Sequence, residues 1–141
     1  MIDRVIGNKQ NLALLITRVV VGLVFVAHGI QKFQGGISGV AGFFDGLGIP
    51  APQFFAWVVA LIETFGGAAL ILGIFTRIGA LFLSGVMVVA IITVKTKLGL
   101  IAPFAQGAGM ELDLALLAGL LSLVLQGSGI FSLEEKMRRR R

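Results

Sequence analysis

The sequence predicts an all-α integral membrane protein, a four-helix bundle built from a single domain at residues 1–141. Two observations of composition predict this class: 57% of the residues are hydrophobic, and only 13% are charged. A soluble domain of this length could not bury so much apolar surface, because small domains keep a large share of their surface exposed. The third observation is that the apolar residues gather in four runs, each long enough at ~1.5 Å per residue for the ~30 Å core of a bilayer.

Four membrane spans follow from these runs. The second and third are separated only by the short turn at residues 73–77, so they are expected to form an antiparallel hairpin. The fourth is the shortest and carries Asp113 inside its first turn, which leaves its start open by a few residues. The predicted spans are residues 11–33, 51–75, 76–95 and 110–126.

Two connections are too apolar for ordinary solvated loops. Residues 35–50 are too short to cross a membrane, so we expect a short interfacial or re-entrant segment between the first and second helices. Gly48 and Pro50 end this segment before the next helix begins. Residues 97–109 form the second apolar connection. Together the two connections predict a lid over the outer end of the bundle.

Basic residues are concentrated at one end of the predicted bundle, which sets its orientation. Cytoplasmic loops carry an excess of Lys and Arg, so the end with more of them faces the cytoplasm. We therefore expect both termini in the cytoplasm, in agreement with an even number of spans. The outer end carries Lys32, Lys95 and Lys97, and the cytoplasmic end carries Arg4, Lys9, Arg77, Lys136 and Arg138 to Arg141.

The basic tail, residues 130–141, opens with a capping box in which Ser132 and Glu135 satisfy backbone groups at the start of a helix. It ends in a run of arginines. Such a cluster attracts anionic lipid by ~1 kcal/mol per charge, so membrane lipids are expected partners. The alternative is a stop-transfer flank that only fixes the topology. Nucleic acid is not an expected partner, because the charges flank membrane segments.

Glu63 lies near the middle of the second predicted span. A carboxylate at mid-depth costs several kcal/mol unless it is paired, hydrogen-bonded or protonated. The first span offers partners: at ~100° per residue, Lys32 lies about 40° and His28 about 80° from Arg18 around the helix. Lipid cannot solvate that face, so it should point into the bundle. We expect Arg18 to pair with Glu63 and Lys32 with Glu111, with His28 between the two pairs.

Each of these residues has a structural role as an alternative. A pair between Arg18 and Glu63 can serve only to fix the register of two helices. Lys32 can be an interfacial anchor, and Glu111 and Asp113 can be favourable charges at the start of a helix. The functional alternative is a cluster that binds a ligand and moves protons.

His28 is the only histidine, and the chain has no cysteine. Disulfides, thiol redox chemistry and iron–sulfur clusters on its own side chains are therefore excluded, and no metal site is expected. An imidazole deep in an apolar helix is either a satisfied hydrogen-bond partner or a proton-handling group. The aromatic side chains of the outer half are either interfacial anchors or the lining of a quinone-ring or lipid pocket; they are Phe25, Phe33, Phe43, Phe44, Phe54, Phe55 and Trp57.

Short motifs follow one another along nearly the whole chain. They are Arg18 with Gly22 and Phe25, His28-Gly29-x-x-Lys32-Phe33, Phe44-x-x-Leu47-Gly48-Ile49-Pro50, Glu63-x-x-Gly66-Gly67, Leu72-Gly73-x-x-Thr76-Arg77, Gly109-x-Glu111 and Gly127-x-Gly129-x-x-Ser132-Leu133. Each motif alone is weak, because glycine and leucine are common in membrane helices. As an ordered set, with acids and bases inside the spans, they are fairly specific. In this set the chain resembles the DoxX family of small four-helix bacterial membrane proteins.

The resemblance implies the fold more directly than the function. Relatives in the DoxX and DoxD group include a subunit of a thiosulfate:quinone oxidoreductase, and others are linked to oxidative-stress and thiol-redox assemblies. The resemblance therefore implies a bacterial cytoplasmic (inner) membrane protein that is the membrane subunit of a quinone- or thiol/sulfur-linked redox system. A bound quinone is the cofactor expected on this reading. The expected catalytic residues are His28 and Glu63, and the expected ligand-binding residues are Arg18, Lys32 and Glu111.

Two other functions stay open. One is a non-enzymatic membrane scaffold that recruits a soluble partner through the Arg-rich tail and the apolar outer loops. The other is a small proton-coupled transporter, although four spans give a narrow pathway and no inverted repeat is evident. Because the chain has neither cysteine nor a set of metal ligands, a redox function requires electron chemistry from a ligand or from a redox protein partner. A homo-oligomer is compatible with all three functions.

Overall fold

The computed structural model describes residues 2–141, with side chains described from residue 9 onward. All regular structure in this range is helical, as predicted, and it includes no strand. Arg4, which contributed to the predicted orientation, lies outside the residues whose side chains are described. Three helical rods in the described range are long and apolar enough to cross a membrane, and they are Lys9–Gly35, Pro52–Leu72 and Thr76–Leu98.

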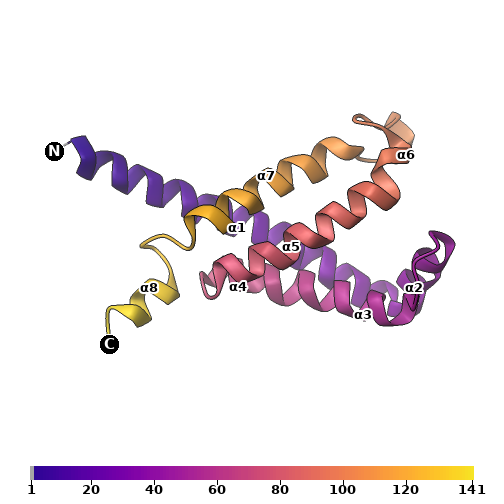
Figure 1. The fold of residues 1–141 in the computed structure, drawn as a ribbon, viewed down its shortest axis with the longest axis horizontal. Helices are drawn as coiled ribbons and strands as arrows, with labels where there is room; N and C mark the ends of the chain where they lie inside the picture. Colours follow the sequence, from indigo (N-terminus) through magenta and orange to yellow (C-terminus); the bar gives the residue numbers. More distant parts are fainter. Residues whose placement is uncertain (1) are drawn as a thin grey trace.

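The rods are built from consecutive helical pieces, among which η1 and η2 are π-helical turns (Figure 1). The first rod is α1 (Ile2–Gly35); the second combines α3 (Pro52–Leu61), η1 (Ile62–Gly66) and α4 (Gly67–Leu72); the third combines α5 (Thr76–Ala90), η2 (Ile91–Lys95) and α6 (Thr96–Leu98). The other elements are α2 (Ile37–Gly46), the 3₁₀ turn η3 (Phe104–Gln106), α7 (Met110–Gln126) and α8 (Leu133–Arg138).

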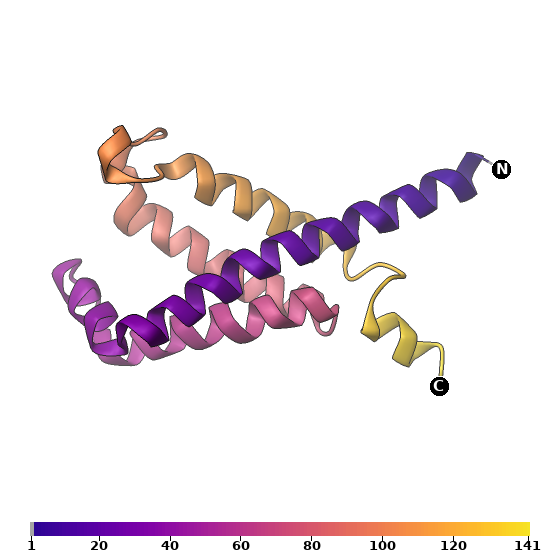
Figure 2. The ribbon, with the colours of Figure 1, turned by 180° about the vertical axis from the view of Figure 1, so that it is seen from behind.

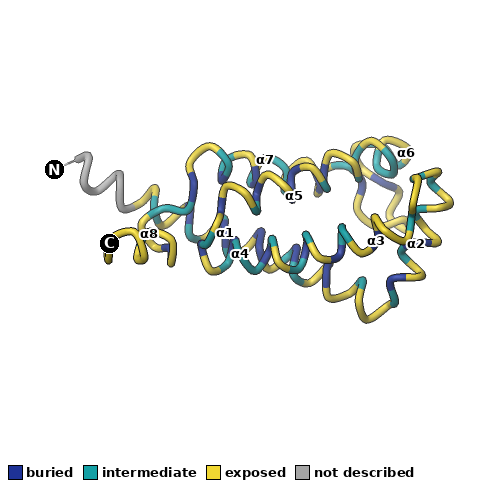
Figure 3. Tube along the Cα trace, turned by 60° about the horizontal axis from the view of Figure 1, so that its bottom comes forward, coloured by how far each residue is buried: buried dark blue, intermediate teal, exposed yellow. Residues whose placement is uncertain are grey.

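The helices pack as two pairs that meet in the middle of the molecule (Figures 1 and 2). α1 lies along the second rod, and α7 lies along α5, which in turn contacts η1. α7 has 17 residues, a length of ~26 Å. Buried residues follow the faces that the helices turn toward one another, and much of the outer surface is exposed (Figure 3). The core where the pairs meet consists of Leu14, Val21, Phe25, Leu70, Ala80, Leu83, Met87, Leu120 and Leu123.

Glycines set the register between α1 and the second rod. A Cβ atom on Gly22 would lie 2.6 Å from the Gly67 carbonyl oxygen, and a Cβ atom on Gly29 would lie 2.1 Å from Thr64 Oγ1. The two backbones can approach this closely only because small residues occupy the contact. The pairing runs antiparallel, so each step along α1 moves the contact back along the second rod.

The turn between α4 and α5 produces the predicted antiparallel hairpin. Gly73 takes a left-handed conformation with φ of 69°, and the amide of Ile74 donates to the Ala69 carbonyl at 3.0 Å. This arrangement ends α4 as a Schellman-type cap, for which glycine is the favoured residue. The second rod therefore ends at Leu72, three residues before the end of the predicted span 51–75.

Both apolar connections lie at the end of the molecule away from α8 (Figure 1). The segment predicted as interfacial or re-entrant contains a ten-residue helix, α2, which packs on α3 through Ile37 and Ala41 against Ala56 and Ala60. The second connection, residues 97–109, is bonded to the start of α7, because the amide of Glu111 donates a hydrogen bond to the Leu100 carbonyl at 3.0 Å.

The tail folds back onto the opposite end. Ser132 Oγ accepts a hydrogen bond from the Glu135 amide at 3.2 Å, which is the N-cap interaction of the predicted capping box. The amide of Glu134 donates to the Gly73 carbonyl at 3.1 Å, so α8 begins beside the α4–α5 turn. The start of α1 lies at this same end of the molecule (Figures 1 and 2).

Candidate functional site

Two π-helical turns interrupt the second and third rods, and each carries an ionisable residue. η1 includes Glu63, and η2 ends at Lys95. A π-helical turn adds a residue to the helical repeat and so turns the following side chains to a new direction, and such turns are frequent at functional sites. Both residues form ion pairs with another helix: Glu63 with α1, and Lys95 with α7. The two turns are therefore candidate positions for a functional site.

Glu63 pairs with Lys32, which links η1 to α1. Lys32 Nζ lies 2.5 Å from Glu63 Oε2. The Glu63 residue is only 4% exposed, whereas the Lys32 side chain is 21% exposed. The ion pair satisfies the energetic requirement of a carboxylate inside a membrane span. Both predicted pairings, Arg18 with Glu63 and Lys32 with Glu111, are therefore wrong.

The glycine register explains this correction. Gly29 lies against Thr64, so the neighbouring Glu63 falls within reach of Lys32 near the end of α1. Arg18 lies more than two turns earlier on α1 and meets Gly73 at the far end of the second rod. Depth estimated from residue counts alone could not supply this register.

Arg18 is fully buried at the end of the molecule that holds the tail. Its Nη2 donates to the Phe131 carbonyl at 2.6 Å, while Nε and Nη1 have no hydrogen-bond partner. Among the described side chains, no carboxylate lies within ion-pair distance of this guanidinium. A Cβ atom on Gly73 would lie 1.7 Å from Nη1, so only glycine leaves room for the Arg18 side chain. Arg18 thus holds the tail against the helices.

His28 lies on the exposed side of α1, so the prediction that it points into the bundle, between two ion pairs, is wrong. Its Nδ1 donates to the Val24 carbonyl one turn earlier, at 2.8 Å. The buried stripe of α1 passes through Phe25 and Gly29, and His28 stands beside that stripe. A separation of 80° from Arg18 was enough to move the imidazole off the packed face.

Glu111 and Asp113 lie at the start of α7, and neither of them pairs with Lys32. Glu111 Oε1 accepts a hydrogen bond from the Gly109 amide at 3.1 Å. Asp113 forms a second buried ion pair, in which its Oδ2 lies 3.7 Å from Lys95 Nζ. Lys95 Nζ also donates a hydrogen bond to the Ala108 carbonyl at 2.8 Å. The sequence analysis missed this pair. The available signal was that both charges stand at the outer ends of neighbouring apolar runs.

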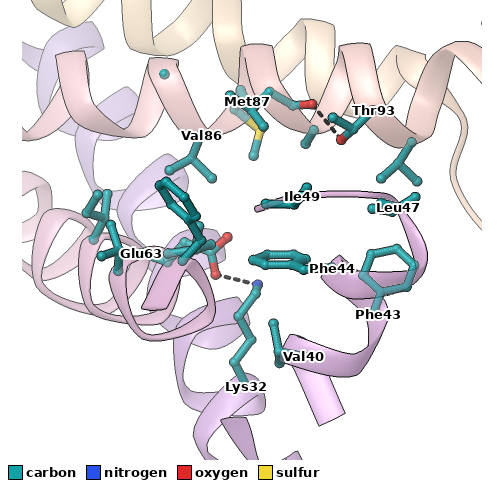
Figure 4. Close-up of a pocket in the computed structure, with 18 of the residues that line it drawn as sticks. Lys32, Val40, Phe43, Phe44, Leu47, Ile49, Glu63, Val86, Met87 and Thr93 are labelled. Carbon is teal, nitrogen blue, oxygen red and sulfur yellow. Dashed lines mark hydrogen bonds and ion pairs between the residues drawn. The ribbon is translucent and has the colours of Figure 1, made fainter. Parts of the chain in front are cut away.

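A cavity of about 930 Å³ lies between α2, α3 and α5, beside the Lys32–Glu63 pair. Figure 4 shows Lys32 and Glu63 joined at one wall, with the Phe44 ring beside them and Met87 and Thr93 across the cavity. Apart from the ion pair, the lining is almost entirely apolar. Neither His28, Arg18 nor Glu111 lines it.

This arrangement is suited to an apolar ligand with a polar head. The volume falls within the range of small-molecule sites, which are mainly apolar with a few polar groups that fix orientation. The Lys32 ammonium can donate a hydrogen bond to a ligand oxygen, and the Glu63 carboxylate can accept a proton. Among the side chains described from residue 9 onward, no three His, Asp or Glu groups gather as a metal site.

The chain belongs to the DoxX family of membrane proteins. The DoxX family model matches residues 13–96, which is more than half of the chain. The match runs from α1 through η2 and so includes Lys32, Glu63 and the cavity-lining part of α5. The resemblance found in the sequence motifs is thereby confirmed.

Several curated proteins are similar over most of their length. The "Putative oxidoreductase CatD" of Bacillus subtilis is 39% identical over 90% of this chain and 89% of its own. An uncharacterized membrane protein of Mycobacterium tuberculosis is 35% identical over 87% of this chain and 80% of its own. The inner membrane protein YqjF of Escherichia coli is 26% identical over 93% of this chain and 96% of its own. No solved structure matches the chain.

Proposed function

We propose that this protein is the membrane component of a redox system and that it binds a lipophilic redox molecule of the quinone class beside Lys32 and Glu63. One observation carries the proposal: an apolar cavity of about 930 Å³ has a single buried ion pair in its wall. The name of the Bacillus subtilis relative, "Putative oxidoreductase CatD", agrees with a redox role.

The rim of the cavity favours a ligand that arrives from the lipid. Phe82 is 58% exposed and belongs to the rod Thr76–Leu98, and Phe43 on α2 is 54% exposed. Large apolar side chains on an outer surface at membrane depth face hydrocarbon. A ligand with an apolar chain can therefore leave its chain in the bilayer while its head reaches the ion pair.

The residues present fit a quinone head group. When bound, such a group supplies two-electron chemistry, which the side chains of this cysteine-free chain do not. Lys32 Nζ would hold a ligand oxygen by a charge-assisted hydrogen bond and stabilise negative charge on that oxygen. Glu63 Oε2, now bonded to Lys32, would hold or pass a proton at the same place. The electrons would come from a partner protein or a reduced sulfur compound.

In this proposal the ion pair replaces the predicted catalytic pair of His28 and Glu63. His28 does not line the cavity, so within one chain it has no ligand to act on. Its catalytic role stays a prediction that requires a second molecule on the exposed face of α1.

We also propose that the three rods and α7 form a four-helix transmembrane bundle in the bacterial inner membrane, with both termini in the cytoplasm. α7 packs along α5, and its ~26 Å approach the thickness of the hydrocarbon core. The basic tail lies where α4 ends and α5 begins, while Lys95 and Lys97 lie at the other end, as the excess of cytoplasmic charge requires.

A scaffold function is the second candidate, and the outer connection favours it. Ile101 and Phe104 are among the most exposed side chains of the chain, on a loop rather than on a span. Such apolar loop residues suit a contact with a soluble partner. The test below also separates this function from the first.

The test is the identity of molecules that co-purify with the protein from native membranes in mild detergent. We expect the parent to carry a quinone, detected by mass spectrometry and its absorption spectrum, and Lys32→Met to lose most of it. Glu111→Gln, outside the cavity, should keep it. A double variant, Lys32→Met with Glu63→Leu, removes both charges together and guards against misfolding of the single variant. A parent that carries only bulk lipid, and unchanged protein partners in all variants, would favour the scaffold.

A further inference from the structure

The end of the molecule opposite the cavity carries a basic surface that the redox proposal does not use. We call it the basic end surface, and it includes the exposed Arg77 at the start of α5. Two carboxylates, Glu134 and Glu135, stand against a larger number of cations. The full set of basic residues is Arg77, Lys136, Arg138, Arg139, Arg140 and Arg141.

The position of this surface is fixed by backbone contacts. The Glu134 amide bonds to the carbonyl of Gly73, the residue that follows the rod Pro52–Leu72. The tail is also held by Arg18 Nη2 on the Phe131 carbonyl. α8 therefore begins at the level where two membrane rods end, which is the level of the lipid head groups.

Apolar side chains are exposed among these cations. Phe75 in the α4–α5 turn is 67% exposed, and Phe131, Leu133 and Met137 are also exposed. On α8, Leu133 and Met137 stand one turn apart and share a face. Cations beside exposed apolar groups are typical of segments that lie in the membrane interface.

Several of the cations are free to bind. Glu135 forms ion pairs with two of them: its Oε2 lies 2.9 Å from Arg138 Nη2, and its Oε1 lies 3.1 Å from Arg139 Nε. Arg140 and Arg77 have no side-chain hydrogen bond or ion pair with any side chain that the structure describes. Arg77 and Arg138 also line a polar hollow of about 500 Å³ that reaches the Gly127–Gly129 loop, and Glu134 and Glu135 line it as well.

We propose that the basic end surface binds the phosphate groups of anionic phospholipids in the leaflet where α4 ends and α5 begins. The cations supply the charge complementarity, the exposed apolar side chains enter the interface, and the contacts to Gly73 and Arg18 hold the surface at head-group depth. This inference is independent of the ligand in the cavity.

The test measures lipid selectivity of the full chain in nanodiscs of phosphatidylcholine that contain a minor share of phosphatidylglycerol. Spin-labelled forms of the two lipids report which one the protein immobilises. We expect a preference for phosphatidylglycerol that falls when Arg138 to Arg141 are all changed to Gln. At about fivefold per charge near the surface, the loss is up to several hundredfold for the four charges together. High salt should weaken the preference in the parent.

Two further variants keep the test sharp. The pair Arg140→Gln and Arg141→Gln breaks no side-chain bond of α8 and should lose part of the preference. Lys97→Gln, an exposed cation at the other end, should retain it. An equal preference in the parent and the fourfold variant, or no preference in the parent, would overturn the proposal. Retention of the co-purifying quinone in every tail variant would leave the redox proposal intact in either case.

Discussion

Arg18 and Lys32 lie on the same helix, but the structure holds them in opposite ways. Lys32 is paired with Glu63 beside an apolar cavity. Arg18 is packed under Gly73, has no carboxylate within ion-pair distance among the described side chains, and donates to a backbone carbonyl. A charged group next to open volume can serve a ligand, whereas a sealed one can serve only the structure.

If the cavity binds a ligand as proposed, this difference divides α1 into a stabilising end and a ligand-binding end. Substitutions near Arg18 should change stability and leave ligand binding intact in whatever protein remains folded. Substitutions near Lys32 should change ligand binding even where stability is restored.

The largest loss of stability is expected for Gly73→Ala. The new Cβ atom would meet the Arg18 guanidinium, and the left-handed backbone at Gly73 disfavours any side chain. The strain and overpacking together should cost up to about 5 kcal/mol. Thermal melts in detergent give the measurement. Gly85→Ala, where a Cβ atom meets nothing within 4 Å, is the control and should melt near the parent.

A smaller loss is expected at the ion pair, and it should be asymmetric. Lys32→Met leaves the Glu63 carboxylate buried without its cation, which should cost about 3 kcal/mol. Glu63→Gln leaves the more exposed Lys32 and keeps a hydrogen-bond acceptor, so it should cost about 1 kcal/mol.

The double variant Lys32→Met with Glu63→Leu sharpens this prediction. It should recover much of the stability lost by Lys32→Met, since no charge then stays buried alone, and it should still bind no ligand. Equal melting temperatures for the two single variants would contradict the asymmetry in burial.

The smallest effect is expected from pH at the tail. Hydrogen bonds from Arg138 and Arg139 hold the pKa of Glu135 below its ordinary value. A carboxyl with a lowered pKa in the folded state stabilises above its unfolded pKa, and this contribution is lost as the pH falls through the folded value. We therefore expect α8 to loosen slightly in acid, below about pH 4.5. Amide hydrogen exchange of residues 133–138 measures this, and Glu135→Gln should remove the pH dependence.

Most of the fold could be predicted from the sequence, because apolar runs and turn glycines are local signals. The rods, the hairpin at Gly73 and the N-cap at Ser132 all follow from residues close together in the chain. These features depend on length, periodicity and capping, which a sequence displays directly.

The partners in the ion pairs could not be predicted from the sequence in the same way. Glu63 was identified as the centre of the polar cluster, but its partner depends on the contact of Gly29 with Thr64 and on the π-helical turn at η1. Neither feature has a periodic signal in the sequence. The prediction for His28 was wrong for a similar reason. Rotating a helix by less than the ~100° between neighbouring residues is enough to move a side chain from the buried stripe to the exposed surface beside it.

In the proposed function, the cavity beside Lys32 and Glu63 holds a quinone-class molecule. A photoreactive azidoquinone bound to the protein in nanodiscs tests it, with labelled peptides mapped by mass spectrometry. We predict labelling of α2 and the cavity face of α5, abolished by Val86→Phe, which fills the cavity, and retained by Val88→Phe on the exposed face. Labelling spread over the lipid-facing surfaces, and unchanged by Val86→Phe, would contradict the claim.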